Sequence, residues 1–443
     1  MDISTDDVTR AVYATDNSIY QIAPTGVTFP TTAEEVQRAV ANNHGAANPL
    51  PIVARGAGTG TNGQSLTDGL VIEVKRHLNR LVSVDPENQT AVVEPGLVTA
   101  KLNAELAAHG LYWAPHTSTL NRATVGGMIS TDAAGKGSLI HGRAHRHVQS
   151  LEVVLADGTP WTAEPVTVAE AEQRANAGSD TGARLWRALL DLPISVGQDF
   201  DFPELARGFS GYGLDRLRRR DSQGVEIIDP VALLCGAEGT LAVITKATLQ
   251  LTKTPASTVL LVASYASFAD ALDDSVDMRG AGPSAIETFD EYTLEQGRSS
   301  VAWPALGSVV GEHRGSVLLL EFEAEFDGEF EAQTGGVDLS AAKAALAATG
   351  RSRSVQALTD PADQRAAWKV RADAVGLLAK VATGGPERSA RPTAFVEDCA
   401  VPVNRMTLFI AEFRALLDSA GLTYGMFGHA DVGCVHVLSL IHI

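Results

Sequence analysis

Cysteine is scarce in this chain, and the few that occur are far apart. Of 443 residues only three are cysteines, Cys235, Cys399 and Cys434. Three scattered thiols form neither a disulfide framework nor a CxxC-type cluster, so we expect no iron–sulfur centre in the chain itself. Few cysteines are also typical of a reducing compartment, and the sequence predicts a cytoplasmic protein.

Long apolar runs and an excess of positive charge are missing as well. No uncharged run reaches the ~18 apolar residues of a membrane span, and the acidic N-terminus lacks the apolar segment of a signal peptide. We therefore expect no integral membrane segment.

Positive charge is also in deficit. Lysine and arginine number 35 against 53 aspartates and glutamates, a net charge of −18. A phosphate backbone repels such a chain, so we expect no nucleic-acid partner.

Glycine and proline, by contrast, are plentiful. The 41 glycines and 19 prolines stand beside 45% hydrophobic residues, which is typical of a globular, loop-rich chain of helices and strands. At ~150 residues per domain, the length predicts two or three domain-sized units.

Strand and helix signals alternate through the first half. Between Gly26 and Arg55 we expect a strand, a helix that begins at Thr31 or Thr32 with a glutamate three residues later, and a second strand. A helical face near residue 100 should end at Gly110. Short strands are predicted at 70–74, 81–85, 90–94, 150–158, with a turn at Asp157 and Gly158, and 241–251. Residues 160–230 look irregular, and the basic stretch 216–224 is interpreted as a solvated loop.

The pattern changes after Pro255. Strands are predicted at 258–265 and 315–326, and helices near 267–276 and 340–348, which indicates a separate α+β unit. We place the domain boundary near residues 252–256.

The first motif that suggests chemistry is PIVARGAGTGTNGQ, residues 51–64. Gly58, Gly60 and Gly63 fit the G-x-G-x-x-G pattern of nicotinamide-binding proteins, but that pattern must open a helix and precede an acidic residue by ~20 positions. The strand expected at 70 leaves no room for a helix. We interpret the motif as a strand-to-strand loop whose backbone N–H groups form a concavity for a diphosphate, with a merely flexible turn as the alternative.

Two further segments are poor in side-chain volume. Residues 116–148 are rich in glycine, serine and threonine, which indicates a large ligand against the backbone. The P-loop alternative fails because Lys136 is followed by Gly137 instead of serine or threonine. The third segment, CGAEGTLAVIT at 235–245, is a tight glycine turn that leads into a buried strand.

Together with Glu94–Gly96, these segments resemble the flavin-binding half of the vanillyl-alcohol oxidase and p-cresol methylhydroxylase (PCMH) superfamily. From Tyr13 to Val437 the chain is similar to the N-terminal part of the large bacterial FAD- and iron–sulfur-containing D-2-hydroxyglutarate dehydrogenases. The resemblance implies an α+β fold: a two-subdomain PCMH-type FAD-binding domain at 1–252 and a ferredoxin-like substrate cap, the FAD-linked oxidase C-terminal domain, at 253–443. The last six residues, LSLIHI, do not match, and we expect a cap truncated at its C-terminus.

The resemblance implies FAD as the cofactor, with its diphosphate over the first segment, its isoalloxazine near the second and its edge against the third. The implied cofactor-binding residues are Arg55, Gly56, Ala57, Gly58, Thr59, Gly60, Thr61, Asn62, Gly63, His116, Thr117, Ser118, Thr119, Thr124, Gly126, Gly127, Ser130, Thr131, Gly135, His141, Gly142, Glu238, Gly239, Val243 and Ile244. His141 stands where many relatives carry tyrosine. A hydrogen-bonding role is favoured there over a covalent flavin link. His145 and His147 are expected at the surface.

A histidine pair follows in YGMFGHADVGCVHV, residues 424–437. His429 and His436 are seven residues apart, on opposite faces of a straight strand, and converge only if Gly433 bends the chain. Two converging imidazoles suit a divalent metal, commonly Zn²⁺, with a carboxylate ligand from elsewhere; ordinary buried histidines are the alternative. The pair is similar to the histidine pair of D-2-hydroxy-acid dehydrogenases, which favours a metal or substrate site.

A predicted helix at 366–378 carries Arg371. This residue matches the arginine that receives the substrate carboxylate in the family, a role suited to a two-pronged guanidinium; a solvated helix arginine is the alternative. Glu397 and Asp398 are expected near the site. Val396 stands where some relatives carry a substrate-binding lysine, for which Lys380 is a possible substitute.

The implied reaction is oxidation of a D-2-hydroxy acid, with 2-hydroxyglutarate favoured, to the 2-oxo acid by hydride transfer to flavin N5. Arg371, His429 and His436 are the candidate catalytic residues. Electrons would then pass to an iron–sulfur module or a quinone-linked acceptor outside this chain. The alternatives are a D-lactate or glycolate dehydrogenase, a flavin-binding subunit without turnover, and a nicotinamide dehydrogenase. The sequence predicts no oligomeric state.

Overall fold

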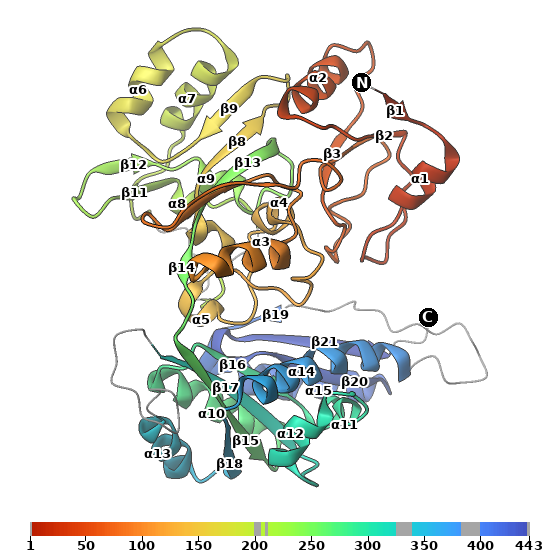
Figure 1. Ribbon diagram of the computed structural model, residues 1–443, viewed down its shortest axis with the longest axis vertical. Helices are drawn as coiled ribbons and strands as arrows, with labels where there is room; N and C mark the ends of the chain where they lie inside the picture. Colours follow the sequence, from red (N-terminus) through yellow and green to blue (C-terminus); the bar gives the residue numbers. More distant parts are fainter. Residues whose placement is uncertain (1, 199–204, 209–210, 325–338, 382–398, 441–443) are drawn as a thin grey trace. The chain divides into compact units, whose positions relative to one another are not determined.

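The computed structural model describes residues 2–198, 205–208, 211–324, 339–381 and 399–440 (Figure 1). The chain divides into two compact units. The first contains residues 1–134, 143–202 and 210–254, and the second contains residues 135–142, 203–209 and 255–443. No helix among the described residues is long and apolar enough to cross a membrane.

Two sheets form the main body of the first unit. The smaller contains β1 (Ile3–Ser4), β2 (Gly26–Thr28), β4 (Leu70–Glu73) and β3 (Ile52–Arg55) in that order, and β4 runs parallel to both of its neighbours. The larger is antiparallel, with β5 (Leu81–Asp85), β6 (Thr90–Val93), β13 (Val243–Gln250), β8 (Val148–Val154) and β9 (Pro160–Ala163). Because β4 begins seven residues after Gly63, no helix follows the glycine loop, as expected.

Helices cover these sheets. They are α1 (Asp7–Tyr13), α2 (Ala33–His44), α3 (Thr99–Leu106), α4 (Val125–Ser130) and the 3₁₀ turns η1 (Ala107–His109) and η2 (Ala144–His147); β7 (Leu111–Tyr112) pairs with β14 (Thr252–Lys253). The predicted start of α2 is confirmed, since the Thr32 hydroxyl accepts a hydrogen bond from Glu35 N. Gly110, in the left-handed region, ends the α3–η1 helix as predicted.

Residues 160–230 are more regular than predicted. They contain β10 (Val166–Thr167), α6 (Val168–Asn176), α7 (Thr181–Asp191), α8 (Leu214–Leu217), β11 (Arg218–Arg220) and β12 (Glu226–Ile228), followed by α9 (Val231–Leu234). Trp186 and Leu189 of α7 pack with Ala171 of α6 in a separate small core. The irregular interpretation is therefore wrong. In α7 the buried residues Ala183, Trp186 and Leu189 recur every three positions, a helical pattern that the irregular interpretation missed.

The second unit is one antiparallel sheet with helices on both faces (Figure 1). The strand order is β18 (Ser352–Leu358), β15 (Ser257–Tyr265), β17 (Ser316–Ala324), β16 (Ala285–Phe289), β20 (Thr423–His429), β21 (Cys434–Leu440) and β19 (Cys399–Ala400). One face packs on α10 (Phe268–Met278), α13 (Ser340–Thr349) and α15 (Met406–Ser419), the other on α11 (Glu291–Gly297), α12 (Trp303–Val310) and α14 (Pro361–Val381). Four short turns complete the unit: α5 (Ser138–His141), η3 (Arg279–Ala281), η4 (Val403–Arg405) and η5 (Ala430–Val432).

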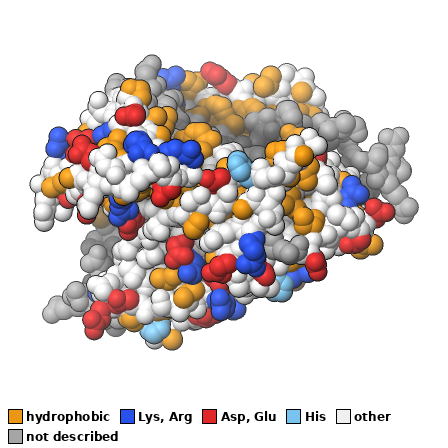
Figure 2. All heavy atoms as spheres, turned by 90° about the horizontal axis from the view of Figure 1, so that it is seen from above, with side chains coloured by type: hydrophobic (Ala, Val, Ile, Leu, Met, Phe, Trp, Pro, Cys, Tyr) orange, Lys and Arg blue, Asp and Glu red, His pale blue; other side chains and the backbone are white. Residues whose placement is uncertain are grey.

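Charges of both signs are mixed on one face of the molecule. On the face shown in Figure 2, basic and acidic side chains of the described residues are interspersed, with small groups of apolar side chains between them. Although the chain is strongly acidic, this face therefore does not carry one large patch of negative electrostatic potential.

Gly96 is a stability determinant of the first unit. Its N–H donates to Leu78 O at 2.7 Å, and an added Cβ would overlap the carbonyl oxygens of Val74 and Leu78. Gly96→Ala is therefore expected to lower the free energy of unfolding by about 1–3 kcal/mol, measured by urea denaturation. Gly178→Ala is the control, because the nearest atom to its new Cβ lies 3.9 Å away. Equal losses in both variants would contradict the steric explanation.

Candidate active site

Arg55 contacts the glycine loop between β3 and β4 and ties it to the N-terminal segment. Its side chain is only 7% exposed, and its guanidinium donates to the carbonyl oxygens of Thr15 at 2.6 Å and Tyr13 at 3.2 Å. Gly58 O accepts from Asn17 N at 3.0 Å. These bonds fix the start of the loop to the N-terminal segment.

The backbone of this loop has unused donors. The N–H groups of residues 57–61 donate to no atom in the described parts of the chain, although the loop is half-buried. Gly58 and Gly63 have positive φ angles of 65° and 78°, a backbone conformation that glycine adopts without strain. These N–H groups are therefore available to water or to a ligand. The oxygens of a diphosphate suit them.

The loop lies directly against α4. Gly56 touches the N-terminus of α4 so closely that an added Cβ would overlap Thr124 Oγ1. Thr124 caps the helix, since its hydroxyl accepts from Gly127 N at 3.3 Å. The predicted first and second segments therefore meet at the start of α4.

The third segment joins α4 at its other end. Gly236 N donates to Ile129 O at 3.1 Å, and Glu238 N donates to Ser130 O at 2.8 Å. Glu238 takes a positive φ of 51°, which is uncommon for a residue with a side chain. Gly127 and Glu238 are exposed, whereas the side chains of Val243 and Ile244 are buried in the core of the unit. Three sequence-distant segments thus surround one short helix.

Three of the residues implied for FAD lie in the second unit: Gly135, His141 and Gly142. They belong to the α5 segment, which packs beside β16 and η5. Lys136 in this segment forms an ion pair with Glu321 of β17 at 2.6 Å, and Trp368 Nε1 donates to the same carboxylate at 2.8 Å. The α5 segment is thereby tied to α14, the helix that carries Arg371.

Arg371, Glu287 and His429 form the polar centre of the second unit. Glu287 on β16 and His429 on β20 are direct partners across an antiparallel pair, and His429 Nδ1 lies 2.5 Å from Glu287 Oε1. Arg371 donates from Nε and Nη2 to Glu287 Oε2 at 3.2 and 3.0 Å. The exposed fractions are 2% for Glu287, 8% for His429 and 9% for Arg371. The solvated-helix interpretation of Arg371 does not fit this burial.

Burial and charge set the protonation of this cluster. Burial acts to raise the pKa of Glu287, but His429 and Arg371 outweigh it and lower the pKa to about 2. Burial also lowers the pKa of His429 to about 4, against the opposing effect of Glu287. The neutral imidazole therefore keeps its proton on Nδ1, toward the carboxylate, and presents a lone pair on Nε2.

The histidine pair converges through a tight hairpin. Gly433, in the left-handed region, joins η5 to β21, and the strand register places His436 opposite Phe427 and Cys434 opposite His429. The ring centroids of His429 and His436 lie 5.2 Å apart at an interplanar angle of 83°. The bend at Gly433 is thus present. Among the described residues, however, no group of three histidine, cysteine, aspartate or glutamate side chains could hold a metal ion, so a metal is not confirmed.

Two acidic residues of this site were missed by sequence reasoning. Glu287 is the one charged residue of the strand AIETF, which is otherwise made of apolar residues and a threonine. A single carboxylate in such a strand is a sequence signal for a buried functional group. Asp431 is 2% exposed; its Oδ2 accepts from Ile286 N at 3.0 Å, and its Oδ1 finds no partner among the described residues. Burial raises the pKa of Asp431 to about 7. Glu397, Asp398 and Val396 lie outside the described residues, as does the side chain of Lys380.

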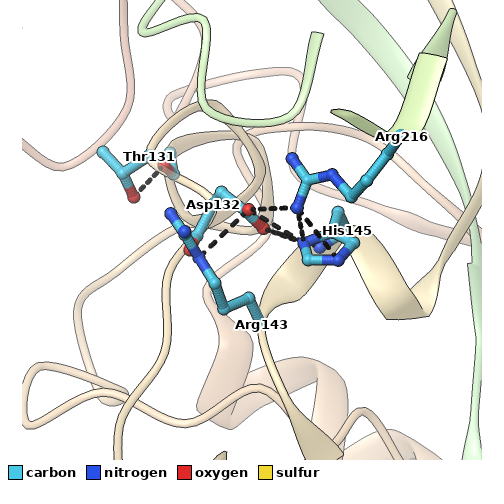
Figure 3. Close-up of polar contacts among 6 residues, drawn as sticks. Thr131, Asp132, Arg143, His145 and Arg216 are labelled. Carbon is cyan, nitrogen blue, oxygen red and sulfur yellow. Dashed lines mark hydrogen bonds and ion pairs between the residues drawn. The ribbon is translucent and has the colours of Figure 1, made fainter. Parts of the chain in front are cut away.

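Two predictions on the first unit are wrong. His147 is buried, and His145 is half-buried with its Nδ1 2.8 Å from Asp132 Oδ2, so neither is a simple surface histidine (Figure 3). Residues 216–220 belong to α8 and β11 instead of a solvated loop, and Arg216 reaches His145 and Asp132. The partners of this cluster come from three distant segments, so the local sequence does not reveal them.

Comparisons with known proteins agree with this geometry. Residues 24–164 match the FAD binding domain family, and residues 254–442 match the C-terminal domain of FAD linked oxidases. A D-2-hydroxyglutarate dehydrogenase from Pseudomonas putida is 38% identical over 439 residues, which cover 98% of this chain and 43% of that protein. Glycolate oxidase subunit GlcD from Bacillus subtilis is 26% identical over 435 residues, 96% of this chain and 75% of that protein.

A solved structure of an alkyldihydroxyacetonephosphate synthase has the same fold, with a TM-score of 0.68 at 14% identity over 99% of this chain and 77% of that one. The fold is therefore that of the PCMH-type flavoproteins, which confirms the predicted α+β class. Residues 24–164 and 254–442 thus match two domain families of FAD-dependent proteins, and the match to the FAD binding domain supports FAD as the cofactor. It spans less than half the length of the Pseudomonas putida relative.

Proposed function

We propose that this chain is the flavin-containing part of a dehydrogenase that oxidises a D-2-hydroxy acid, with 2-hydroxyglutarate favoured, to the 2-oxo acid. The observation that carries the proposal is the buried Arg371–Glu287–His429 cluster, in a chain similar to a D-2-hydroxyglutarate dehydrogenase. A PCMH-type FAD-binding domain at 1–252 and a substrate cap at 253–443 are the proposed domains.

FAD fits the first unit because the unpaired N–H groups of residues 57–61 supply donors for its diphosphate. The remaining cofactor contacts are assigned to the segments around α4 and to the α5 segment with His141. Bound FAD supplies the two-electron acceptor for the substrate hydride at N5.

Arg371 is assigned the substrate carboxylate. Of its five N–H donors two are directed at Glu287, so the guanidinium is held in one orientation while further donors remain for a ligand. Where no metal is bound, His429 Nε2, whose lone pair is left open by the Nδ1 bond to Glu287, is assigned the proton of the substrate hydroxyl. Glu287 thereby positions both groups at once.

A divalent metal, Zn²⁺ in our proposal, also suits the histidine pair. An imidazole whose Nδ1–H is bound by a carboxylate is the usual arrangement of a metal-ligating histidine. His429 and His436 would hold the ion, with a third ligand outside the described residues, and the ion would polarise the hydroxyl oxygen. We propose an iron–sulfur module or a quinone-linked carrier as electron acceptor.

Anaerobic titration of the FAD-loaded chain tests the proposal. D-2-hydroxyglutarate should bleach the flavin absorbance, whereas L-2-hydroxyglutarate should not. Bleaching by D-lactate or glycolate alone would instead favour a monocarboxylate dehydrogenase, an alternative supported by valine at position 396 in place of a lysine. A yellow protein that no hydroxy acid bleaches would contradict turnover, and a colourless protein that responds to NAD(P) would contradict the flavin assignment.

The flavin loops are tested separately by Gly56→Ala. The new Cβ overlaps Thr124 Oγ1 but lies 3.3 Å from Thr124 Cβ, so the variant should push the loop away from α4. We expect FAD affinity to fall at least roughly tenfold, as for a clash that costs more than 1 kcal/mol. Gly56→Ala/Thr124→Ala should recover most of it, measured by flavin fluorescence, with Thr124→Ala as control. If the double variant binds no better than Gly56→Ala, the predicted packing is wrong.

A further inference from the structure

Arg207 lies beside the histidine pair of the second unit, although it comes from a distant part of the sequence. It belongs to the second unit, whereas residues 143–202 and 210–254 on either side belong to the first. Arg207 Nη1 donates to Cys434 Sγ at 2.7 Å. Cys434 is fully buried, but Arg207 is only half-buried and is therefore accessible to a ligand. The reaction proposed above does not use this guanidinium.

Three neighbouring strands, β16, β20 and β21 (Figure 1), place three side chains in one row. His429 on β20 is paired with Glu287 on β16 and with Cys434 on β21. Directly paired residues of antiparallel strands project from the same face of a sheet. Arg371 binds the Glu287 end of this row, and Arg207 binds the Cys434 end. The two guanidiniums therefore flank His429 from opposite sides.

The positive charge of Arg207 acts on the same site. Burial is the main cause of the low pKa of His429, and the charge of Arg207 lowers this pKa further. Burial raises the pKa of Asp431, and Arg207 opposes that rise. A charge shifts the pKa of another group in this way when it lies near that group. Arg207 therefore adds positive charge to a site in which Arg371 is already paired with Glu287.

The spacing along this row suits a dicarboxylate. Antiparallel partners lie about 4.5–5.5 Å apart, so two steps separate the Cα atoms of Glu287 and Cys434 by about 10 Å. An extended five-carbon dicarboxylate has four C–C bonds of ~1.5 Å, which put about 5 Å between its carboxyl carbons. Charged hydrogen bonds of about 2.8 Å at each end extend this span to roughly 10 Å. One carboxylate therefore reaches Arg371 while the other reaches Arg207.

We propose that Arg207 binds the distal carboxylate of the substrate and makes the site selective for D-2-hydroxy dicarboxylic acids over D-2-hydroxy monocarboxylic acids. This inference rests on the proposed function, in which Arg371 binds the carboxylate beside the hydroxyl. A guanidinium has five N–H donors in a planar fork that matches a carboxylate. One donor of Arg207 is directed at Cys434, and this bond holds the fork next to His429. A substrate with one carboxylate does not engage Arg207.

Isothermal titration calorimetry of the FAD-saturated chain tests the assignment. The probes are 2-oxoglutarate and 2-oxopentanoate, which have the same chain length and differ in the second carboxylate. We expect the wild type to bind 2-oxoglutarate roughly 10–100-fold more tightly, as for one additional charged hydrogen-bonded pair. Arg207→Gln should remove this preference and leave the affinity for 2-oxopentanoate unchanged. Both probes are already 2-oxo acids, so the measurement does not depend on turnover.

Two further variants separate the role of the guanidinium from general effects. Arg207→Lys keeps the charge but loses the fork, so it should weaken 2-oxoglutarate binding several-fold and leave 2-oxopentanoate binding unchanged. Arg353→Gln is the matched control, because Arg353 is exposed on β18, at the edge of the sheet opposite to β21 and β19. Circular dichroism verifies that each variant is folded.

The inference is overturned if the wild type binds the two probes equally, if Arg207→Gln keeps the wild-type preference, or if Arg353→Gln loses it. Should Arg207→Gln be unfolded, an unchanged affinity for 2-oxoglutarate in Arg207→Lys overturns it in the same way.

Anaerobic flavin bleaching separates this outcome from a failure of the proposed function. If D-2-hydroxypentanoate bleaches the wild type as readily as D-2-hydroxyglutarate does, the hydroxy-acid reaction stands and the role of Arg207 is overturned. If 2-oxoglutarate binds through Arg207 but no hydroxy acid bleaches the flavin, the carboxylate site stands and the proposed reaction is overturned.

Discussion

Glu287→Gln is expected to slow substrate-dependent flavin reduction by about 10–100-fold while FAD binding stays unchanged. Glutamine fills the same space but carries no charge, so Arg371 loses its counter-ion and His429 its strongest acceptor. The reduction rate follows from anaerobic stopped-flow absorbance, and FAD affinity from flavin fluorescence. If Glu287 had only a structural role, the folded fraction of Glu287→Gln would reduce its flavin at the wild-type rate.

The same variant should lose about 3 kcal/mol of unfolding free energy at neutral pH, because it breaks a buried ion pair. The folded-state pKa of Glu287 is about 2, below that of an unfolded glutamate, so its stabilisation is present above about pH 4.3. It disappears as the pH falls toward 2. The stability curves of the wild type and Glu287→Gln should therefore converge in acid.

Asp274→Asn is the matched control for Glu287. Asp274 is fully buried in the same unit and pairs with Arg351 at 2.7 Å, but it contacts neither Arg371 nor His429. We expect this variant to lose stability and to retain the wild-type rate of flavin reduction. A parallel loss of rate in Asp274→Asn would mean that general destabilisation, and not the position of His429 and Arg371, explains the effect.

Arg371→Lys should raise KM for D-2-hydroxyglutarate on the order of 100-fold, with a smaller change in kcat. Lysine keeps the positive charge but loses the planar fork that can bind Glu287 and a substrate carboxylate together. Steady-state assays with an artificial electron acceptor measure both constants. Arg365→Lys, an exposed position on the same helix, should behave like the wild type. An unchanged KM in Arg371→Lys would show that Arg371 does not bind the substrate carboxylate.

Local signals in the sequence were enough to predict many elements. The Thr31–Glu35 pattern predicts the start of α2, and the positions of Gly63 and Leu70 exclude a helix after the glycine loop. The predicted turn at Asp157 and Gly158 matches the pairing of β8 with β9. Caps, turns and strand spacing act over a few residues, so the sequence displays them directly.

The partners of His145 could not be predicted in this way, whereas the capping box of Thr167 and Glu170 at the start of α6 is a local signal that the irregular interpretation missed. His145 meets Asp132 and Arg216, the latter 71 residues away along the chain. A basic stretch such as 216–220 looks solvated until its ion-pair partners are known. Folding of the intervening chain, and not any pattern within the stretch, brings those partners together.

The sequence by itself predicted which loops offer bare backbone to a cofactor, and it predicted that the chain must bend between the two histidines if they are to converge. Only the tertiary structure decided that Glu287, 84 residues before Arg371 and 142 before His429, binds both. The reason is physical: the register of β16 against β20 and the packing of α14 on the sheet place one carboxylate between two distant groups. The local sequence around each residue does not encode these long-range contacts.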